Sequence, residues 1–528
     1  MRKTLDIKIQ AVILYLKEAL TNFNLIAIII AILTTGFLRL QIIGSPPSSD
    51  GGFYSFTSQW LYNAVAQDII IKDSRLFLYQ FMVSWVYALD VNQIILLRII
   101  DGFVAIAASI VLFNVILKES GSKLFTVILI VPLLIILHDF TNVLYGFRNS
   151  IWASYLALFG ALILWQKYSK EGNFSFYLIG ALISMGVLLR ETFLPFSVLA
   201  GIAIYVAYGG HALVKYLIGS AVLGFSVLIF MLMFRGWDLQ NLIDSYTLYA
   251  GLYKDFPNIG LTVKAGILHL IQTGWFVCIL SIASIFYFIK INFSDKKSVS
   301  ANRFYFWVLV ALIPLIEPIF KLGFHYHYSN SLIGLAGLCA MSWKYLSIKE
   351  SKQIKKLSII LIGLLSLFVV IPTVNSNVIK VSRIILPSNA ILWAKTYDSF
   401  RYKNVIESSQ YLTLAAKIYS LSKEDSTLVT SGMMQVLHPL TNLLPPTYEL
   451  SWLRYLYVKM NFDENKLIKI IKKHRPTLIV TTDWSAGEAA MSEIIDKIDI
   501  YEKVAVIPSN STKTYGYKSG TIFRLKDY

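Results

Sequence analysis

The sequence predicts a polytopic α-helical membrane protein with about eleven transmembrane helices and a small C-terminal α/β soluble domain. Apolar runs recur through the first two-thirds of the 528 residues, most of them near the roughly 20 residues that a helix needs to cross a bilayer. Hydrophobic residues make up 56% of the chain and charged residues 15%, a balance that a single water-soluble core does not have. From Asn389 onward the composition becomes that of an ordinary soluble domain.

Hydropathy divides residues 1–372, the predicted membrane module, into eleven spans. Several are shorter than a full crossing, so a re-entrant pair of helices remains an alternative. The spans are Leu25–Ile43, Ile94–Leu117, Leu124–Leu137, Ile151–Trp165, Phe174–Leu189, Phe193–Tyr208, Tyr216–Phe234, Leu270–Ile289, Phe304–Phe320, Ser331–Tyr345 and Leu357–Ile371.

Basic residues collect in alternate loops, as the positive-inside rule requires of cytoplasmic loops. Lys118 and Lys123 lie in the first such loop, and lysines recur in every second loop after it. The net charge of +17 therefore indicates membrane topology and not a nucleic-acid partner. We expect a cytoplasmic amino terminus, a periplasmic or extracellular C-terminal domain and, from the abundance of Ile, Lys and Asn, a bacterial inner membrane. Cys278 and Cys339 both fall in apolar runs and predict no disulfide framework.

The C-terminal extracytoplasmic domain, residues 389–528, is predicted to mix helices and strands. Helical periodicity covers Tyr411–Leu421 and Glu464–Lys472, and β-rich runs cover Thr427–Thr430, Thr477–Thr481 and Lys503–Ile507. Tyr515–Leu525, with a turn at Lys518–Gly520, has the pattern of a closing β-hairpin.

The outer loop at residues 44–93 carries the most informative pattern. Asp50 stands just outside the first span and is followed by two glycines. Apolar residues then recur at helical spacing from Phe53 to Val65, and a second such segment covers Leu76–Leu89. Two helices in the membrane interface would hold Asp50 at the level of the lipid headgroups.

This layout resembles the GT-C superfamily of membrane glycosyltransferases, in the group that transfers mannosyl or aminoarabinosyl units from polyprenyl-phosphate donors. The resemblance implies that Asp50 is the catalytic base, which takes the proton of an attacking acceptor hydroxyl. The acceptor would be a glycan, a lipid or a protein. The alternative is that Asp50, beside Gly51, forms a turn or caps the following helix.

Cations and aromatic residues at the outer ends of spans are the candidates for binding the donor phosphate. Arg190 has two other uses, pairing with Glu191 or extending to the membrane surface. His325 and His327 could also bind a metal, although no carboxylate lies near them in the sequence. The candidate set is Arg148, Arg190, Lys321, His325, His327 and Tyr328.

Second-tier candidates are acidic or histidine residues near the same ends of the spans: His138, Asp139, Glu191 and Glu317. Some GT-C enzymes bind a divalent metal, Mg²⁺ or Mn²⁺, with a second acid where His138 and Asp139 stand. No paired-acid spacing occurs here, so no metal ligand is assigned, and Asp139 alternatively caps a turn. Glu317 is expected to face a cavity, a cation or a neighbouring helix.

Two other classes of protein share part of this pattern. A membrane polysaccharide polymerase or ligase also uses lipid-linked donors, but tends to carry its active residues in a large loop between late spans. A transporter or flippase needs many helices, and should show paired halves with broken helices and charges at mid-membrane depth. The sequence shows no internal repeat, so we expect an inverting glycosyltransferase.

Overall fold

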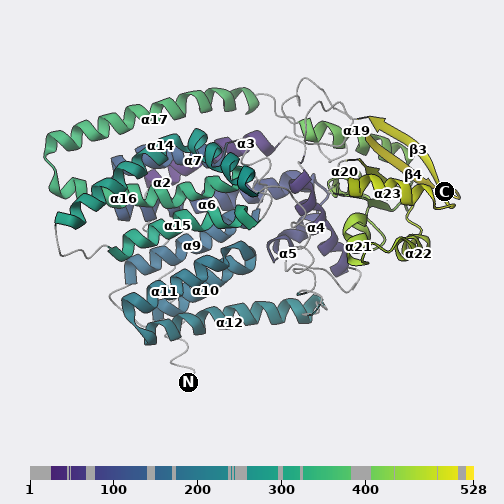
Figure 1. Cartoon of the computed structure of the whole chain (residues 1–528), viewed down its shortest axis with the longest axis horizontal. Coiled ribbons are helices and arrows are strands. Elements are labelled where there is room, and N and C mark those ends of the chain that lie inside the picture. The colour runs from purple at the N-terminus through teal and green to yellow at the C-terminus, as the bar shows by residue number, and fades with distance from the viewer. Residues whose placement is uncertain are drawn as a thin grey trace.

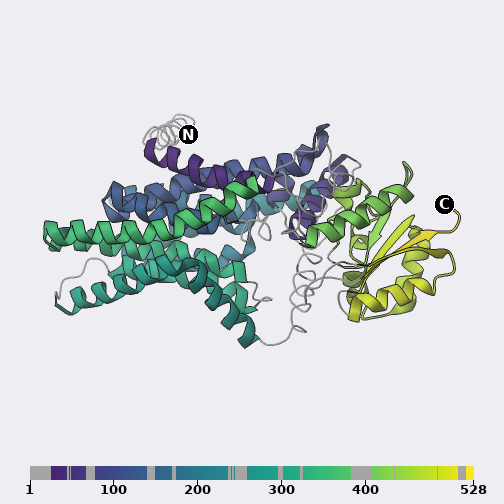
Figure 2. The ribbon, with the colours of Figure 1, turned by 90° about the horizontal axis from the view of Figure 1, so that it is seen from above.

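The structure is a computed structural model that describes residues 25–43, 47, 49–66, 78–139, 149–168, 174–235, 240, 243, 259–294, 301–320, 325–381, 406–432, 434–483, 486–508 and 519–528. A bundle of long helices lies beside a smaller unit that contains one β-sheet (Figure 1). The view from above shows the same division along the long axis of the molecule (Figure 2). We call the smaller unit, residues 406–528, the C-terminal segment.

Each predicted span coincides with an apolar helix of the bundle. Six helical stretches are long and apolar enough to cross a membrane, and five apolar helices are shorter. The helical fold class is therefore confirmed for the described residues, while the number of crossings stays a prediction. The helices are α2 (Leu25–Ala31), α3 (Phe37–Ile43), α6 (Gln93–Ser120), α7 (Lys123–Leu137), α9 (Asn149–Tyr168), α10 (Phe174–Leu189), α11 (Leu194–Tyr208), α12 (Gly210–Arg235), α14 (Ile259–Ser294), α15 (Ala301–Phe320), α16 (Ser331–Lys349) and α17 (Lys352–Val381).

The first span is continuous but not uniform, because a π-helical turn, η1 (Ile32–Gly36), joins α2 to α3. Thr35 in this turn is fully buried, and its hydroxyl hydrogen-bonds that of Ser109 in α6 at 2.9 Å. Single π-helical turns of this kind are rare within α-helices and are frequently found at functional sites. Here the irregular turn fixes the first span against α6.

Glycines allow a close helix contact between α10 and α12. A Cβ atom on Gly180 would lie 2.1 Å from the carbonyl oxygen of Tyr216, and one on Gly219 would lie 2.0 Å from that of Tyr177. Small residues let two membrane helices approach at backbone distance and gain dispersion contacts that lipid cannot supply. A side chain at either position would force the two helices apart.

Helices also occupy both segments that the sequence assigns to the outer loop. They are α4 (Ser49–Ala66), α5 (Leu78–Val83) and the 3₁₀-helix η2 (Ser84–Ala88). The apolar face of α4 is covered by protein, since Phe56, Trp60 and Leu61 are all buried. Figures 1 and 2 show α4 at the junction between the bundle and the C-terminal segment.

A four-stranded sheet forms the middle layer of the C-terminal segment, in the order β1-β2-β4-β3. Strands β1 (Leu428–Thr430) and β2 (Leu478–Thr482) are parallel, and β4 (Ser519–Leu525) runs antiparallel to β2 and to β3 (Tyr501–Pro508). The expected turn at Lys518–Gly520 is wrong at Gly520, because this residue lies inside β4 opposite Thr482. A Cβ on Gly520 would lie 2.8 Å from Leu414, so this glycine serves close packing and not a turn.

Helices cover both faces of the sheet. On one face, α19 (Ile406–Leu421) and α20 (Leu437–Thr441) share a core with Leu428, Leu478 and Ile522. On the other, η5 (Tyr448–Ser451), α21 (Leu453–Lys459), α22 (Glu464–His474) and α23 (Ala486–Asp496) pack on Val429, Ile479 and Phe523. Ile94, at the start of α6, joins the first core, so the segment is anchored on the bundle by apolar contact.

Candidate functional site

The order of the helices brings the sequence-predicted site residues to one end of the bundle. His138 follows α7 directly, Arg190 joins α10 to the 3₁₀-helix η3 (Glu191–Phe193), and the 3₁₀-helix η4 (His325–Asn330) precedes α16. Consecutive helices joined by short turns alternate in direction, so these connections and the end of α3 share one end. It is the end beside α4 and the C-terminal segment (Figure 1).

Asp50 lies in the first turn of α4. A carboxylate in the first turn is stabilised in its ionised form by the positive end of the helix dipole. This backbone position, at the start of a helix, is common to the capping and the catalytic interpretations. Arg148 and Lys321 lie outside the described residues, and only the backbone is described for Asp50, Glu191, Glu317, His325 and His327.

A buried ion pair lies behind this end of the bundle. Arg39 of α3 donates through Nη1 to Oδ2 of Asp101 in α6, and the two side chains are 2% and 0% exposed. Arg39 also donates through Nε to Nδ1 of His138 at 3.2 Å. The His138 ring stacks on Trp152 of α9 with centroids 4.3 Å apart, and the Arg39 guanidinium lies 5.8 Å from the same indole.

Further hydrogen bonds tie the end of α3 to its neighbours. Gln41 donates to the carbonyl of His138 at 3.1 Å. Arg98 of α6 donates to the carbonyls of Ile42 and Ile43, the latter at 3.3 Å. The last carbonyls of a helix lack partners within it and carry partial negative charge, so an arginine there satisfies both needs. The end of α3, seven residues before Asp50, is thereby held in place.

Three buried polar atoms of this cluster have no hydrogen-bond partner among the described residues: Oδ1 of Asp101, Nε2 of His138 and the hydroxyl of Tyr79 in α5. Because Arg39 donates to Nδ1 of His138, the neutral ring carries its proton on Nε2. Burial and the charge of Arg39 hold the pKa of His138 well below its ordinary value. Burial and the negative charge of Asp101 raise the pKa of Tyr79.

The cluster can accept or donate hydrogen bonds, but its chemistry does not suit a divalent metal at His138. The Nδ1 lone pair is already used by Arg39, whose positive charge would repel a cation beside it. Among the residues that the structure describes, no three His, Cys, Asp or Glu side chains form a possible metal site. Asp139, the next residue, is half-buried.

Sequence reasoning named His138 but missed Arg39, Asp101, Arg98 and Tyr79. A usable signal was present for the first three, since each is a charge inside an apolar run. Charges within membrane helices are costly and tend to face the protein interior with a partner. What could not be read from the sequence is that Arg39 and Asp101, 62 residues apart, pair with each other.

Arg190 is buried at the corner between α10 and α11, only 7% exposed. Its Nε donates to Oγ1 of Thr192 at 3.1 Å, and its amide donates to the carbonyl of Gly186 at 3.0 Å. The side chain is thus held inside the protein and does not extend to its surface. A buried guanidinium fixed by hydrogen bonds is suited to stabilise a phosphate group that loses its sugar.

Tyr328 in η4 is also buried, and its ring lies directly on Gly266 of α14, where a Cβ would be 2.0 Å away. Its hydroxyl has no hydrogen-bond partner among the described residues. The contact with Gly266 therefore fixes the position of the Tyr328 ring, and the hydroxyl can bind a ligand or water.

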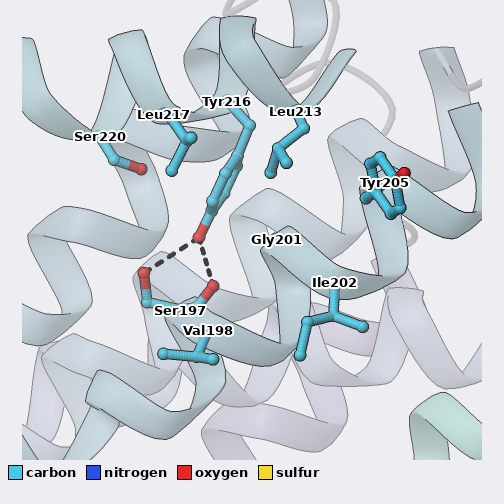
Figure 3. Close-up of a pocket in the computed structure, with 9 residues that line it drawn as sticks. All are labelled: Ser197, Val198, Gly201, Ile202, Tyr205, Leu213, Tyr216, Leu217 and Ser220. Carbon is cyan, nitrogen blue, oxygen red and sulfur yellow. Dashed lines mark hydrogen bonds between the residues drawn. The ribbon is translucent and has the colours of Figure 1, made fainter. Parts of the chain in front are cut away.

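An open groove of about 430 Å³ lies between α11 and α12, on a different part of the bundle. Figure 3 shows apolar walls formed by Val198, Ile202, Leu213 and Leu217. The Tyr216 hydroxyl donates to the carbonyl of Ser197 at 2.7 Å across its floor. The groove follows the two helices from their turn at Gly209, at the opposite end from α4, and no acid, base or cation lines it.

No known protein-family model matches this chain, and no curated protein matches it either. The fold defines the class as a helical protein with several helices long and apolar enough for a membrane.

Proposed function

We propose that this protein is an inverting membrane glycosyltransferase that moves a sugar from a polyprenyl-phosphate donor to a glycan, lipid or protein acceptor. The observation that carries the proposal is the position of Asp50. It begins the helix that lies where the bundle meets the C-terminal segment, at the same end as buried Arg190 and η4. An acid and a fixed cation at one membrane face are the two groups that this reaction requires.

In the proposed reaction, the Asp50 carboxylate takes the proton of the acceptor hydroxyl as the oxygen attacks the anomeric carbon. The bond from that carbon to the lipid phosphate breaks, and the configuration inverts. Arg190 and the residues of η4 stabilise the negative charge that grows on the departing phosphate. The bonded network around Arg39 keeps α3 and the start of the outer loop in place during this step.

The proposed orientation has this end outside the cytoplasm, with eleven crossings and an extracytoplasmic C-terminal segment in a bacterial inner membrane. Lysines at the other end of the bundle support it. Lys118 lies in the last turn of α6, Lys123 begins α7, and Lys349 and Lys352 flank the turn between α16 and α17. Cytoplasmic loops carry such an excess of positive charge.

The decisive experiment measures transfer of a radiolabelled sugar from polyprenyl phosphate in membranes with matched amounts of protein. Asp50→Asn should lower the rate by about 10²–10⁴-fold, the usual contribution of a general base. Asp90→Asn is the matched control, because it removes the same charge from an exposed position of the same outer region. Equal rates for wild type and Asp50→Asn would remove Asp50 from the site.

Transport is a second candidate, and the buried Arg39–Asp101 pair is the observation that favours it. Intramembrane charges commonly mark the path of a substrate. Movement of a lipid-linked sugar between the leaflets of vesicles that contain the protein, without formation of a new glycosidic bond, would support a transporter. A product extended by many sugar units would instead support a polymerase.

A further inference from the structure

The C-terminal segment packs along one face of helix α4. Phe56 stacks on His438, with ring centroids 4.4 Å apart and an angle of 29° between the planes. It also stacks on Tyr448, at 5.6 Å and 14°. Phe56 and His438 are both fully buried, so this contact belongs to a packed core and not to a loose surface.

The first turn of α4 touches the C-terminal segment even more closely. A Cβ on Gly52 would lie 2.1 Å from Cβ and 2.4 Å from Cα of Val436, the residue that precedes α20. Any larger residue at position 52 would push the two backbones apart. Gly52 is only two residues from Asp50, so such a shift would move the carboxylate.

A polar contact extends the same face of α4. Gln59 donates through Nε2 to Oδ1 of Asn442 at 3.0 Å. Positions 52, 56 and 59 are separated by four and three residues, which places them on one face of a helix. Ser55, three residues after Gly52 and one before Phe56, lies at the edge of this face. Its hydroxyl and carbonyl hydrogen-bond the Tyr87 hydroxyl of η2 at 2.6 and 2.9 Å. Helix α4 is therefore held both by the C-terminal segment and by η2.

We propose that the C-terminal segment is a positioning part of the active site, which sets the place of Asp50 through Gly52, Phe56 and Gln59. The catalytic part of this inference rests on the proposed function. A displacement of about 1 Å at a reacting group can cost about 10²-fold in rate. The contacts of α4 with Val436 and His438 provide the constraint that prevents it. The segment thus acts on catalysis through α4, whatever acceptor it also contacts.

Gly52→Ala tests the proposal, because the added methyl group meets backbone and cannot be accommodated by a side-chain rotation. We expect kcat to fall by about 10²-fold while KM for the lipid-linked donor changes less than about threefold. Gly210→Ala is the matched control, since it makes the same change in a helix with nothing within 4 Å of the new atom. Asn442→Gly should lower kcat by a few fold, and its φ of 58° suits glycine.

A cross-link tests the contact independently of activity. Gln59→Cys combined with Asn442→Cys, treated in membranes with a short bis-maleimide, should yield one cross-linked peptide pair by mass spectrometry. Absence of this pair would overturn the inference. A cross-link with unchanged kcat in Gly52→Ala, or with equal loss in Gly210→Ala, would overturn the positioning role. A cross-link in the double-cysteine variant, together with no sugar transfer by the wild-type protein, would remove the proposed function and leave the contact established.

Discussion

The bundle and the C-terminal segment place their charges in opposite ways. In the bundle, Arg39 and Asp101 pair at 2% and 0% exposure. In the C-terminal segment, the ion pairs lie on the surface, as in Arg475–Asp527 at 52% and 79% and Lys472–Asp499 at 45% and 75%. Water stabilises a surface charge without help, whereas a charge on a membrane helix needs a partner inside the protein.

Apolar residues show the reverse distribution. Large apolar side chains such as Phe225, Phe286 and Phe368 are 63%, 69% and 72% exposed on the bundle helices. In the C-terminal segment, Ile479 and Phe523 of the sheet are at most 1% exposed. This contrast indicates that lipid is the expected solvent of the bundle and water that of the C-terminal segment. The same substitution should therefore have different costs in the two regions.

The largest effect on stability should come from the buried ion pair. Asp101→Ala leaves Arg39 buried without its carboxylate and should lower the free energy of unfolding by about 3–5 kcal/mol. Denaturant unfolding of the protein in detergent would measure the change. The double variant Arg39→Met/Asp101→Leu removes both charges and should regain most of the loss. Equal losses in the single and double variants would show that packing, not charge, stabilises this site.

A smaller effect should appear in the C-terminal segment as the pH falls. Burial lowers the pKa of His438 to about 4, against 6.5 for an exposed histidine. Below about pH 6.5 His438 is protonated in the unfolded chain but stays neutral in the folded chain. The free energy of unfolding therefore falls as the pH is lowered from about 6.5 to about 4, and it is constant above about pH 6.5. The total loss is about 3 kcal/mol, at about 1.4 kcal/mol for each unit of pKa difference.

Thermal unfolding between pH 4 and 8, followed for wild type and His438→Gln, measures this linkage. The variant has no histidine to protonate in the unfolded state, so its stability should depend less on pH over that range. Parallel pH curves for the two proteins would contradict a buried, neutral His438.

The smallest effect should come from an exposed ion pair. Nζ of Lys497, the residue after α23, lies 3.0 Å from Oε1 of Glu464 in α22. The two side chains are 61% and 36% exposed. Lys497→Ala should lower the free energy of unfolding by less than about 1 kcal/mol, and less still at high salt. Denaturant unfolding at two salt concentrations would measure it. A loss as large as that of Asp101→Ala would contradict the proposed difference between buried and surface ion pairs.

Most of the helical fold could be predicted, because it depends on local pattern. An apolar run near 20 residues becomes a helix wherever its neighbours lie, and all eleven predicted runs coincide with helices. The runs around Val429, Ile479 and Val506 likewise lie in strands. The turn at Gly520 was wrongly predicted because the role of this glycine depends on tertiary packing. A glycine that packs against Leu414 has the same local sequence pattern as a glycine in a turn.

The site was predictable only in part, for a related reason. Charged and aromatic residues near the ends of apolar runs, including Asp50, His138 and Arg190, could be identified from the sequence alone. The three-dimensional structure was needed to show that Arg39 meets Asp101 and that Phe56 meets His438, 382 residues further along the chain. Such pairs depend on how helices and sheet pack against each other, and packing is a property of the whole chain rather than of any short window within it.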